Sequence, residues 1–585
     1  MQDACEIPGA VKDWPATCLH VALLSLLVVA IYFSRMTLLP ACGEESRWAH
    51  GAVQMLETGD WIVPRQQRQV FVDRPPMASW TMAAVALVRG EVDLVAIRLP
   101  SALAMLGTTL IVYFYARTFL TWFGALAAGA MFATLGQVLQ LGQLGENEAL
   151  FTMLVSGSLL AWHAGYAAGR SSGVTWSAGY ALAALAALQK GPQAPVYFVA
   201  VTGAYLLLRR DWRWLLGWGQ WIGASCFVLV IAAWEIPFWR ATNLADAVGI
   251  WTRSAAFRVN KGSLLEHMAT FPLETFACLL PWSALAVGLL DPRIRRALGR
   301  MPAHVAFLLT SVVVTYPSVW LVSGSRGRYF MPLYPCIALM LAWIAQRCVQ
   351  AAPGTVARRG WDRFLLGAVA AVLVSGIAVA AVSFLPQIPL REIAQPAAFA
   401  VIYLIAALAT AAVLFRMRGR GEQRHACVAV MALASYLGLS YTGAVLNAVA
   451  VTANDLRPAV ASLKEQLPRA NLVSFGPIFH RFAFAYEAPI RQIEWPSSLH
   501  DVPEEVEYFC YDYKPGDTEM LRDSGRGFYW TTTPGTLPLR WEEVAVIPCG
   551  RRVTGGEQRK VIVGRILRDR AVAQRSNSSA AERRE

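Results

Sequence analysis

Charged residues are scarce in this chain. Asp, Glu, Lys and Arg together make up 16% of its 585 residues, whereas hydrophobic residues make up 56%. A soluble protein of this length needs a larger polar surface to stay dispersed in water. The shortage of charge therefore argues against a soluble globular enzyme and predicts a membrane protein.

Patterns for binding metal or nucleic acid are also missing. The ten cysteines include no Cys-x-x-Cys and no Cys/His spacing typical of a metal site. No basic stretch with interleaved aromatic residues occurs, which argues against nucleic acid as a partner. A cleaved signal peptide would carry a basic segment before its hydrophobic run, but here three acidic residues and only Lys12 precede the first run. We therefore expect this run to be a retained membrane span.

Hydrophobic residues gather in runs of about 20, the length that crosses a bilayer as a helix. The first runs from about Cys18 to Met36. The others are centred near Ala104, Ala127, Ser158, Ala183, Ala200, Phe227, Leu280, Val312, Leu339, Val372, Ala407 and Ala434. These runs predict an all-α polytopic membrane domain of about thirteen transmembrane helices over residues 1–450.

The net charge of +13 comes largely from arginines in alternate loops. The arginines of these loops are Arg209, Arg210 and Arg213; Arg293, Arg295, Arg296 and Arg300; Arg358, Arg359 and Arg363; and Arg416, Arg418, Arg420 and Arg424. Basic loops stay in the cytoplasm. We therefore expect a bacterial-type inner membrane protein whose amino terminus is cytoplasmic, and whose first loop, 37–90, and carboxyl-terminal part are periplasmic.

The chain changes character after about Val451. The stretch "LRPAVASLKEQL" has helical spacing, and short β-rich runs follow: "NLVSFG", "RQIEW", "VEYFCYDY", "GFYWTTT", "EEVAVIP" and "KVIVGRIL". They predict a small periplasmic α/β domain over residues 451–570, followed by a polar, disordered tail over 571–585. Cys510 and Cys549 both lie in this domain, and the sequence allows a disulfide between them without predicting one.

The first periplasmic loop begins with two adjacent carboxylates, Glu44 and Glu45. Apolar residues follow at helical spacing (Ala49, Ala52, Val53 and Leu56), which predicts an amphipathic helix at the membrane interface. Glu44 precedes the first turn of this helix, where the helix dipole favours carboxylates, and it can pair with Arg47. Glu44 and Glu45 thus either cap the helix or act in a functional site.

Further ionisable residues fall on the same side of the membrane. They are Asp73 and Arg74 before a double proline, Glu146 and Glu148, Lys190 before Gly191-Pro192, Arg253, Arg258, Lys261 and His267, and Arg326 and Arg328. Charges at membrane depth are costly and commonly carry function or pairing. Such a set suits a reaction in which an anionic leaving group departs.

The motifs that carry these residues resemble those of one family. The order "EESRWA…LETGDWIVP…VFVDRPP…RLPSAL" is similar to that of the GT-C glycosyltransferases, which use polyprenyl-phosphate sugars. Within that family, the resemblance is to the lipid A aminoarabinose transferases and their protein O-mannosyltransferase relatives. It also covers "EALFT", the Lys190-Gly191-Pro192 turn, "LLPWS" and "RGRYFMPLYP", within residues 35–345.

The resemblance implies roles for individual residues. Glu44 stands at the position of the family's catalytic aspartate, and Glu148 matches a second acid of the active cavity. The residues that would bind the donor phosphate are Lys190, Arg258, Arg326, Arg328 and Arg74, and those that would line the substrate cavity are Glu45, Arg47, Asp73 and Tyr329. The implied activity moves a sugar from undecaprenyl phosphate to lipid A or another envelope acceptor, with membrane lipids as further partners.

This sequence departs from the family pattern at three places. Glu replaces Asp at positions 44 and 148, and Asp73-Arg74 replaces a Glu-Lys pair. Each change keeps the charge but shifts the charged group, so the sugar and the acceptor stay open. If the acceptor is a hydroxyl, Glu44 is a general base. If the acceptor is a phosphate, Glu44 instead orients the sugar.

Other interpretations remain for these residues. Asp73 and Arg74 are also compatible with a surface ion pair, and Lys190 with a helix end. The sequence assigns no cofactor, and it allows a divalent metal on His267 with Asp73 or Glu266 as oxygen ligand. As whole-protein alternatives, a glycosyltransferase of another acceptor and a polytopic transporter also fit the span count; a transporter, however, needs charged segments at mid-depth, and few occur.

Overall fold

The computed structural model describes residues 14–71, 74–242, 263–299, 302–385, 393–467, 472–513, 537, 539–550 and 559–568. The chain forms two compact units. Unit 1 comprises Met1–Leu39 and Asp73–Thr452, and unit 2 comprises Pro40–Val72 and Ala453–Glu585. Residues 40–72, which are part of the predicted first loop 37–90, thus belong to the same unit as the carboxyl-terminal residues.

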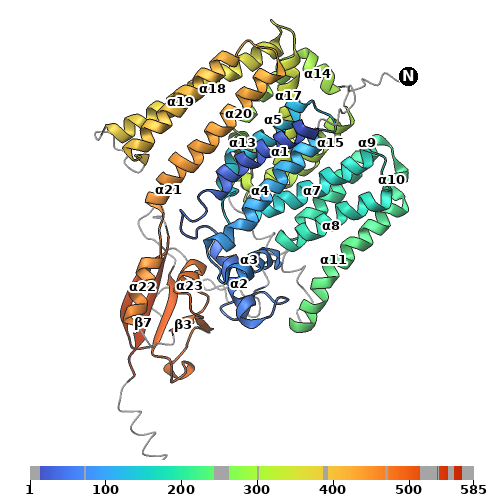
Figure 1. Ribbon diagram of the computed structural model, residues 1–585. Helices are drawn as coiled ribbons and strands as arrows, with labels where there is room; N and C mark the ends of the chain where they lie inside the picture. Colours follow the sequence, from blue (N-terminus) through green and yellow to red (C-terminus); the bar gives the residue numbers. More distant parts are fainter. Residues whose placement is uncertain are drawn as a thin grey trace, which may run out of the picture. The chain divides into compact units, whose positions relative to one another are not determined.

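Unit 1 is helical (Figure 1). Its elements are α1 (Trp14–Val28), η1 (Val29–Phe33), α3 (Met77–Arg89), α4 (Leu94–Ala116), α5 (Trp122–Ala133), α6 (Gly136–Leu141), α7 (Asn147–Ala167), α8 (Ser172–Lys190), α9 (Gln193–Arg209), α10 (Trp212–Leu216), α11 (Trp218–Thr242), α13 (Leu264–Cys278), η2 (Trp282–Leu290), α14 (Pro292–Gly299), α15 (Ala303–Thr315), α16 (Pro317–Trp320), η3 (Gly327–Leu333), α17 (Tyr334–Gln350), α18 (Val356–Phe384), α19 (Ala397–Met417), α20 (Gln423–Leu439), η5 (Ser440–Val445) and α21 (Leu446–Thr452).

The hydrophobic runs of the sequence coincide with these helices. Each predicted centre lies inside a helix except Leu280, which falls at the break between α13 and η2, where the two helices meet at 110°. Among the described residues, eight helices are long and apolar enough to cross a membrane, or nine if that bent pair is one span. The protein is therefore a multi-pass membrane protein, but the expected thirteen spans are not confirmed, in part because α5 and α9 have only 12 and 17 residues.

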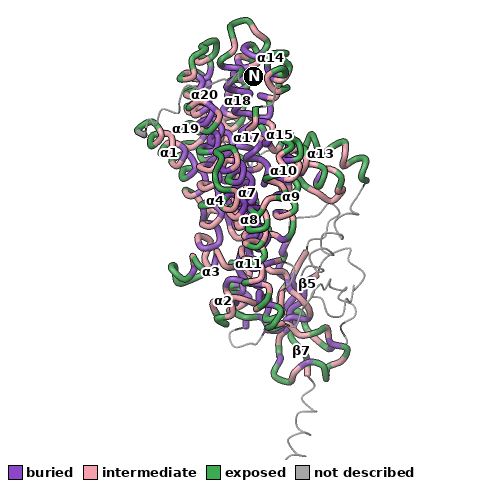
Figure 2. The backbone as a smooth tube through the Cα atoms, turned by 90° about the vertical axis from the view of Figure 1, so that its right-hand side faces the viewer, coloured by how far each residue is buried: buried purple, intermediate pink, exposed green. Residues whose placement is uncertain are grey.

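Burial differs strongly between the helices of unit 1. Most residues of α17 are buried, whereas most residues of α11, α18 and α19 are intermediate or exposed (Figure 2). Exposed apolar helix faces are stable only where they contact lipid or another apolar surface. This distribution fits a bundle with α17 inside and lipid around α11, α18 and α19.

Small residues allow α11 to pack closely against α8, and the two helices lie side by side in Figure 1. A Cβ atom added at Gly223 would lie 2.8 Å from the backbone carbon of Trp176, and one added at Gly219 would lie 2.8 Å from that of Ser172. Glycines at such contacts bring helix backbones together in membranes.

Unit 2 combines the first loop with a five-stranded sheet. Its elements are α2 (Glu45–Thr58), β1 (Arg65–Gln66), β2 (Gln69–Val70), α22 (Arg457–Gln466), β3 (Leu472–Phe475), α23 (His480–Tyr486), β4 (Arg491–Ile493), η6 (Leu499–Asp501), β5 (Tyr508–Tyr513), β6 (Trp541–Pro548) and β7 (Lys560–Ile566). The strand order is β4-β3-β5-β7-β6. β3 is parallel to β4 and β5, and β7 is antiparallel to β5 and β6.

Alternating residues of the strands form two cores, one on each face of the sheet. Cys510 and Val561 pack with residues of α22 and α23, whereas Phe509, Tyr511 and Ile562 form an aromatic and aliphatic layer on the opposite face. This alternation follows from the two-residue period of a strand. The predicted α/β character of this part of the chain is thus confirmed.

Two further expectations about the carboxyl-terminal part have different outcomes. Cys510 and Cys549 are free, buried thiols, and their Sγ atoms donate to the carbonyls of Val473 and Ile547, so the disulfide that the sequence left open is not formed. Burial raises the pKa of Cys549 to about 12, which keeps this thiol protonated and unreactive. The predicted strand at "GFYWTTT" and the tail 571–585 lie outside the described residues.

We expect Gly223→Ala to destabilise unit 1, because the new methyl group must push α11 away from Trp176. Overpacking of this kind costs about 1–3 kcal/mol, so the melting temperature of the protein in detergent should fall by several degrees. Gly203→Ala in α9 is the matched control, since its added Cβ would meet nothing within 4 Å. Equal melting temperatures for the two variants would contradict the close packing.

Candidate functional site

The predicted site residues divide between the two units. Glu148, Lys190, Arg328 and Tyr329 belong to unit 1, and the pair at the start of α2, Glu44 and Arg47, belongs to unit 2. Arg258 and Asp73 lie outside the described residues. Each group is described below by itself.

Three chain segments bring the residues of the first group together. Glu148 lies in the first turn of α7, and Lys190 in the last turn of α8, so each charge has the sign that its helix end favours. α8 ends at Gly191, whose φ of 103° few other residues adopt without strain. Arg328 and Tyr329 come from η3.

These side chains form a buried charge quartet, which we define as Glu146, Glu148, Lys190 and Arg328. The Nζ atom of Lys190 donates to Glu148 Oε1 at 3.0 Å. The Nη1 atom of Arg328 donates to Glu146 Oε2 at 3.0 Å, and its Nε atom lies 3.9 Å from Glu148 Oε1. The Lys190 and Glu148 side chains are only 11% and 5% exposed. The quartet thus holds two positive and two negative charges largely away from water, and its most accessible member is Arg328, whose side chain is 26% exposed.

Two features of the quartet point to anion binding. The Nε atom of Arg328 is buried and makes no hydrogen bond. A buried donor without a partner is costly, and one explanation is a ligand that completes it. The aromatic rings of Phe151 and Tyr329 lie 5.4 and 5.3 Å from Lys190 Nζ, so they shield this ammonium group from solvent and strengthen its field.

Glu146 is a site residue to which the sequence analysis gave no role, although it noted Glu146 beside Glu148 among the ionisable residues. In the structure, both acids bind cations of the same quartet. The spacing "ENE" at the start of α7 was the available signal. Next to it, Gln189 Nε2 donates to Asn147 Oδ1 at 3.2 Å, which ties the end of α8 to the start of α7 a second time.

The second group surrounds the start of α2. Glu44 Oε2 lies 2.7 Å from Arg47 Nη1, and the Glu44 side chain is 39% exposed. Glu45 is fully buried, and its Oε2 atom accepts from the backbone N–H of Cys42 at 2.9 Å. Glu45 therefore anchors the loop before the helix, while Glu44 remains accessible.

A polar network joins α2 to the sheet domain of unit 2. Ser46 Oγ and His480 Nδ1 lie 2.7 Å apart. The Gln67 side chain donates to Ser474 Oγ and accepts from the backbone N–H of Ile478, both at 2.9 Å. Its own backbone N–H donates to His50 Nε2 at 3.2 Å. The sequence analysis missed these residues, since no local pattern links positions so far apart.

The remaining predicted residues in the described part of the chain are Arg74, His267 and Arg326. Arg326 is exposed at the start of η3, and Arg74 lies partly buried just before α3. The Nε2 atom of His267 hydrogen-bonds to the carbonyl of Val319 at 3.1 Å. Within the described part of the chain, no three His, Cys, Asp or Glu side chains could hold a metal ion together, so the metal role left open for His267 finds no support.

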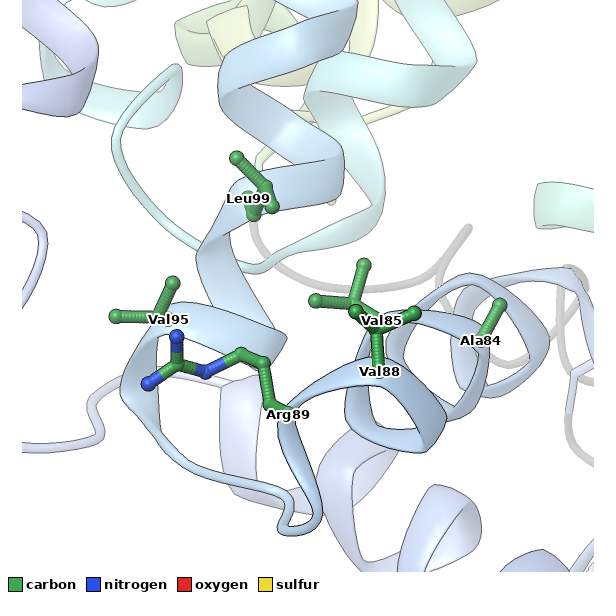
Figure 3. A pocket seen from close by; sticks show the side chains of 6 residues that line it. All are labelled: Ala84, Val85, Val88, Arg89, Val95 and Leu99. Atoms are coloured by element: carbon green, nitrogen blue, oxygen red, sulfur yellow. The ribbon is translucent and has the colours of Figure 1, made fainter.

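A hollow of about 340 Å³ lies between α3 and the start of α4 (Figure 3). Its lining is aliphatic apart from the Arg89 side chain. Because Arg89 is already paired with Asp93, this hollow offers an apolar surface but no uncompensated charge. None of the predicted site residues lines it.

Known proteins match this chain in sequence over its amino-terminal part. Residues 73–236 match the family described as dolichyl-phosphate-mannose-protein mannosyltransferase. An undecaprenyl phosphate-alpha-4-amino-4-deoxy-L-arabinose arabinosyl transferase of Pseudomonas aeruginosa is 30% identical over 318 residues, which cover 52% of this chain and 55% of that protein. A protein of the same name from Edwardsiella ictaluri is 25% identical over 320 residues, with the same coverage. The chain thus matches little more than half the length of these relatives.

Solved structures match the chain over nearly its whole length. The crystal structure of ArnT from Cupriavidus metallidurans bound to undecaprenyl phosphate gives a TM-score of 0.64 at 17% identity, covering 95% of this chain and 98% of that one. The apo form gives the same TM-score and identity over 94% and 98%. The chain therefore has the fold of that protein, and the resemblance to the polyprenyl-phosphate glycosyltransferases is confirmed.

We expect Lys190→Met to destabilise the protein by about 3 kcal/mol, because it removes the hydrogen-bonded partner of the buried Glu148 carboxylate and leaves only the more distant Arg328 beside it. The double variant Lys190→Met/Glu148→Gln should recover much of this loss, and the free energy of unfolding in mild detergent measures both. As control, Arg89→Met breaks an exposed ion pair and should change stability by no more than about 1 kcal/mol. Additive effects in the double variant would show that the pair is not coupled.

We also expect unit 2 to lose stability in acid. Burial lowers the pKa of His50 to about 4, and burial followed by the charge of Arg47 lowers that of His480 well below its ordinary value. The unfolded chain binds these protons at about pH 6.5, so stability is complete above this pH and falls as the pH drops toward 4. At pH 5, protonation of His50 in the unfolded chain should lower the free energy of unfolding by about 2 kcal/mol.

Thermal melting followed by tryptophan fluorescence between pH 7 and 5 measures this loss. His50→Gln should reduce the pH dependence, whereas the control His500→Gln, at an exposed position of the same unit, should leave it unchanged. A melting temperature of the wild-type protein that is constant over this range would contradict neutral, buried histidines.

Proposed function

We propose that this protein is an integral membrane glycosyltransferase. It would move a sugar from a polyprenyl-phosphate donor to an envelope acceptor, with aminoarabinose-type transfer from undecaprenyl phosphate to lipid A as the specific reaction. The observation that supports the proposal is the charge quartet, in which Lys190 and Arg328 are paired with Glu148 and Glu146 and are largely shielded from water. The names of the relatives and the fold of ArnT support the same class of donor.

The donor phosphate is the leaving group of this reaction. The bond between the sugar C1 atom and a phosphate oxygen breaks, and the lipid phosphate leaves with one more negative charge than it had as a diester. Fixed cations in a site of low dielectric stabilise this developing charge. Lys190 supplies a point charge, and Arg328 offers its unpartnered Nε donor. Glu146 and Glu148 hold the two cations in place before the donor binds.

Glu44 is the proposed group on the acceptor side. It is more exposed than Glu45, and Arg47 holds it in one orientation. With a hydroxyl acceptor, Glu44 takes the proton as the new bond to C1 forms. With a phosphate acceptor, which is already anionic, no proton has to be removed, and Glu44 orients the sugar or binds its amino group.

The proposed topology places the donor site at the periplasmic face of the inner membrane. The arginine-rich loops would stay in the cytoplasm together with the amino terminus, and unit 2 would be periplasmic. The 1–450 part would then be the catalytic domain together with the first loop, and 451–570 a periplasmic domain. Membrane lipids would surround the exposed apolar helices.

We expect Glu44→Gln and Lys190→Ala to reduce sugar transfer at least a hundredfold, since each removes a charge that acts on a reacting group. Mass spectrometry of total lipids from cells making each variant measures the result. Lipid A should lack a sugar-sized mass, and the donor lipid should accumulate. The control Glu57→Gln changes an exposed acid near the end of α2, the helix that Glu44 precedes, and should leave both pools unchanged.

The other outcomes are also informative. Donor accumulation with unchanged lipid A would keep the enzyme class but assign another acceptor, such as a protein or a second glycolipid. Unchanged donor and lipid A pools in both variants would contradict the proposal and favour a transporter.

A further inference from the structure

The short helix η3, which carries Arg328 of the charge quartet, depends on other helices to hold its start. It has seven residues of 3-10 geometry, and runs of this kind longer than three or four residues are uncommon because their hydrogen bonds are poorly aligned. The side chain of Arg326, directly before η3, makes no capping hydrogen bond. The first N–H groups of η3 therefore need acceptors from outside their own segment.

Glu274 of α13 supplies such an acceptor. Its Oε1 atom accepts from the backbone N–H of Gly327, the first residue of η3, at 2.7 Å. Gly327 is buried, whereas Glu274 is exposed, so a solvated carboxylate satisfies a donor that water does not reach. Hydrogen bonds to an ionised acceptor are stronger than neutral ones. Glu274 thus caps η3 from a different helix.

Gly327 is held on its other sides as well. A Cβ atom added there would lie 2.8 Å from Cys278 Sγ and 3.1 Å from Glu274 Oε1. Tyr334 Oη donates to Gln137 Oε1 at 2.7 Å and lies 3.2 Å from the carbonyl oxygen of Gly327. The missing side chain therefore lets α13 approach this backbone closely, and residues of α6, α13 and α17 fix its position.

This fixed backbone leads directly into the charge quartet. Arg328 follows Gly327, and its Nη1 atom donates to Glu146 Oε2 at 3.0 Å. On the other side of Arg328, the carbonyl of Tyr329 accepts from Gln193 Nε2 at 3.5 Å. Because a hydrogen bond of this length is lost when its atoms move apart by about 0.5 Å, a small displacement of Gly327 is enough to disturb the contacts of Arg328.

We propose that Glu274 is a positioning residue for the donor phosphate. By holding Gly327, it fixes the backbone from which Arg328 reaches the charge quartet, and it thereby sets where the guanidinium group meets the phosphate. This inference rests on the proposed function and adds a residue outside the motifs of the sequence analysis. Binding groups have to be held within about 0.5 Å of their productive geometry by supporting residues. Glu274 meets this need through the backbone and without contact to the donor.

Two substitutions separate positioning from a direct action of the charge. Glu274→Gln keeps an oxygen that accepts from Gly327, whereas Glu274→Ala leaves the buried N–H without a partner. We expect Glu274→Ala to weaken binding of undecaprenyl phosphate about tenfold and Glu274→Gln no more than about threefold. Microscale thermophoresis with the full-length protein in detergent gives the dissociation constants. Equal losses in the two variants would show that the charge acts by itself and would overturn the proposal.

The matched control is Thr270→Ala, one turn earlier in α13. It removes an exposed hydroxyl group that donates to the carbonyl of Glu266 in the same helix, and it should leave binding unchanged. If Glu274→Ala fails to fold, Glu274→Asp takes its place, because it keeps the charge but draws the accepting oxygen back by one methylene group.

A double-mutant cycle tests whether Glu274 acts through Arg328. If it does, Glu274→Ala/Arg328→Gln should bind undecaprenyl phosphate as weakly as Arg328→Gln alone, since the group to be positioned is already gone. Losses that multiply in the double variant would overturn the proposal. If Arg328→Gln fails to fold, Glu146→Gln/Arg328→Gln is the background for the same cycle, because it removes both partners of the ion pair.

The kinetics of sugar transfer distinguish positioning from a loss of stability. Glu274→Ala should raise KM for the polyprenyl-phosphate donor and leave KM for the acceptor unchanged, because only the donor meets Arg328. A lower melting temperature with unchanged donor binding would mean that Glu274 only stabilises the fold, and would overturn the proposal.

This inference and the proposed function can fail separately. If Arg328→Gln weakens binding of undecaprenyl phosphate but Glu274→Ala does not, the donor site stands and the role of Glu274 is wrong. If both variants bind as weakly as expected but the wild-type protein transfers no sugar, the proposed function is wrong and the positioning of Arg328 stands. Equal binding by the wild-type protein and Arg328→Gln would overturn the inference together with the proposed donor site.

Discussion

Removing a charged side chain from water is costly, and this cost governs where the charges of both units lie. In unit 1, the acids at the start of α7 are compensated by cations from the end of α8 and from η3. In unit 2, the exposed Glu44 is paired with Arg47, whereas the fully buried Glu45 receives a backbone N–H. Since a buried charge requires its partner, the residues proposed for chemistry also hold the helix ends of the bundle together.

Local features of the sequence predicted most of the fold. Run length and hydropathy located the helices of unit 1, and strand alternation located β3 to β7, because both depend on near neighbours in the chain. The bend of 110° near Leu280 could not be seen in this way, since a hydrophobic run has the same composition whether it is straight or bent. The number of membrane crossings is open for a related reason: short helices such as α5 are apolar but do not reach the length of a span.

The candidate site was predictable where a motif carries the residue. Glu148, Lys190 and Arg328 were identified from three separate motifs, and they meet in the structure although 42 and 182 positions separate the bonded partners of the quartet. The network around Ser46 and His480 was not predictable, because a serine and a histidine without a local pattern are indistinguishable from surface residues.

The grouping of residues 40–72 with the carboxyl-terminal sheet has a consequence for biogenesis. Ser46 and its partner His480 are 434 positions apart, and at ribosomal rates of 5–20 residues per second the helix α2 leaves the ribosome roughly 20–90 s before that partner exists. During this interval the segment that carries Glu44 has none of its contacts with α23. A nascent chain therefore completes the folding of its first loop only near the end of synthesis, and a prematurely terminated chain leaves that loop unfolded and recognisable to proteases.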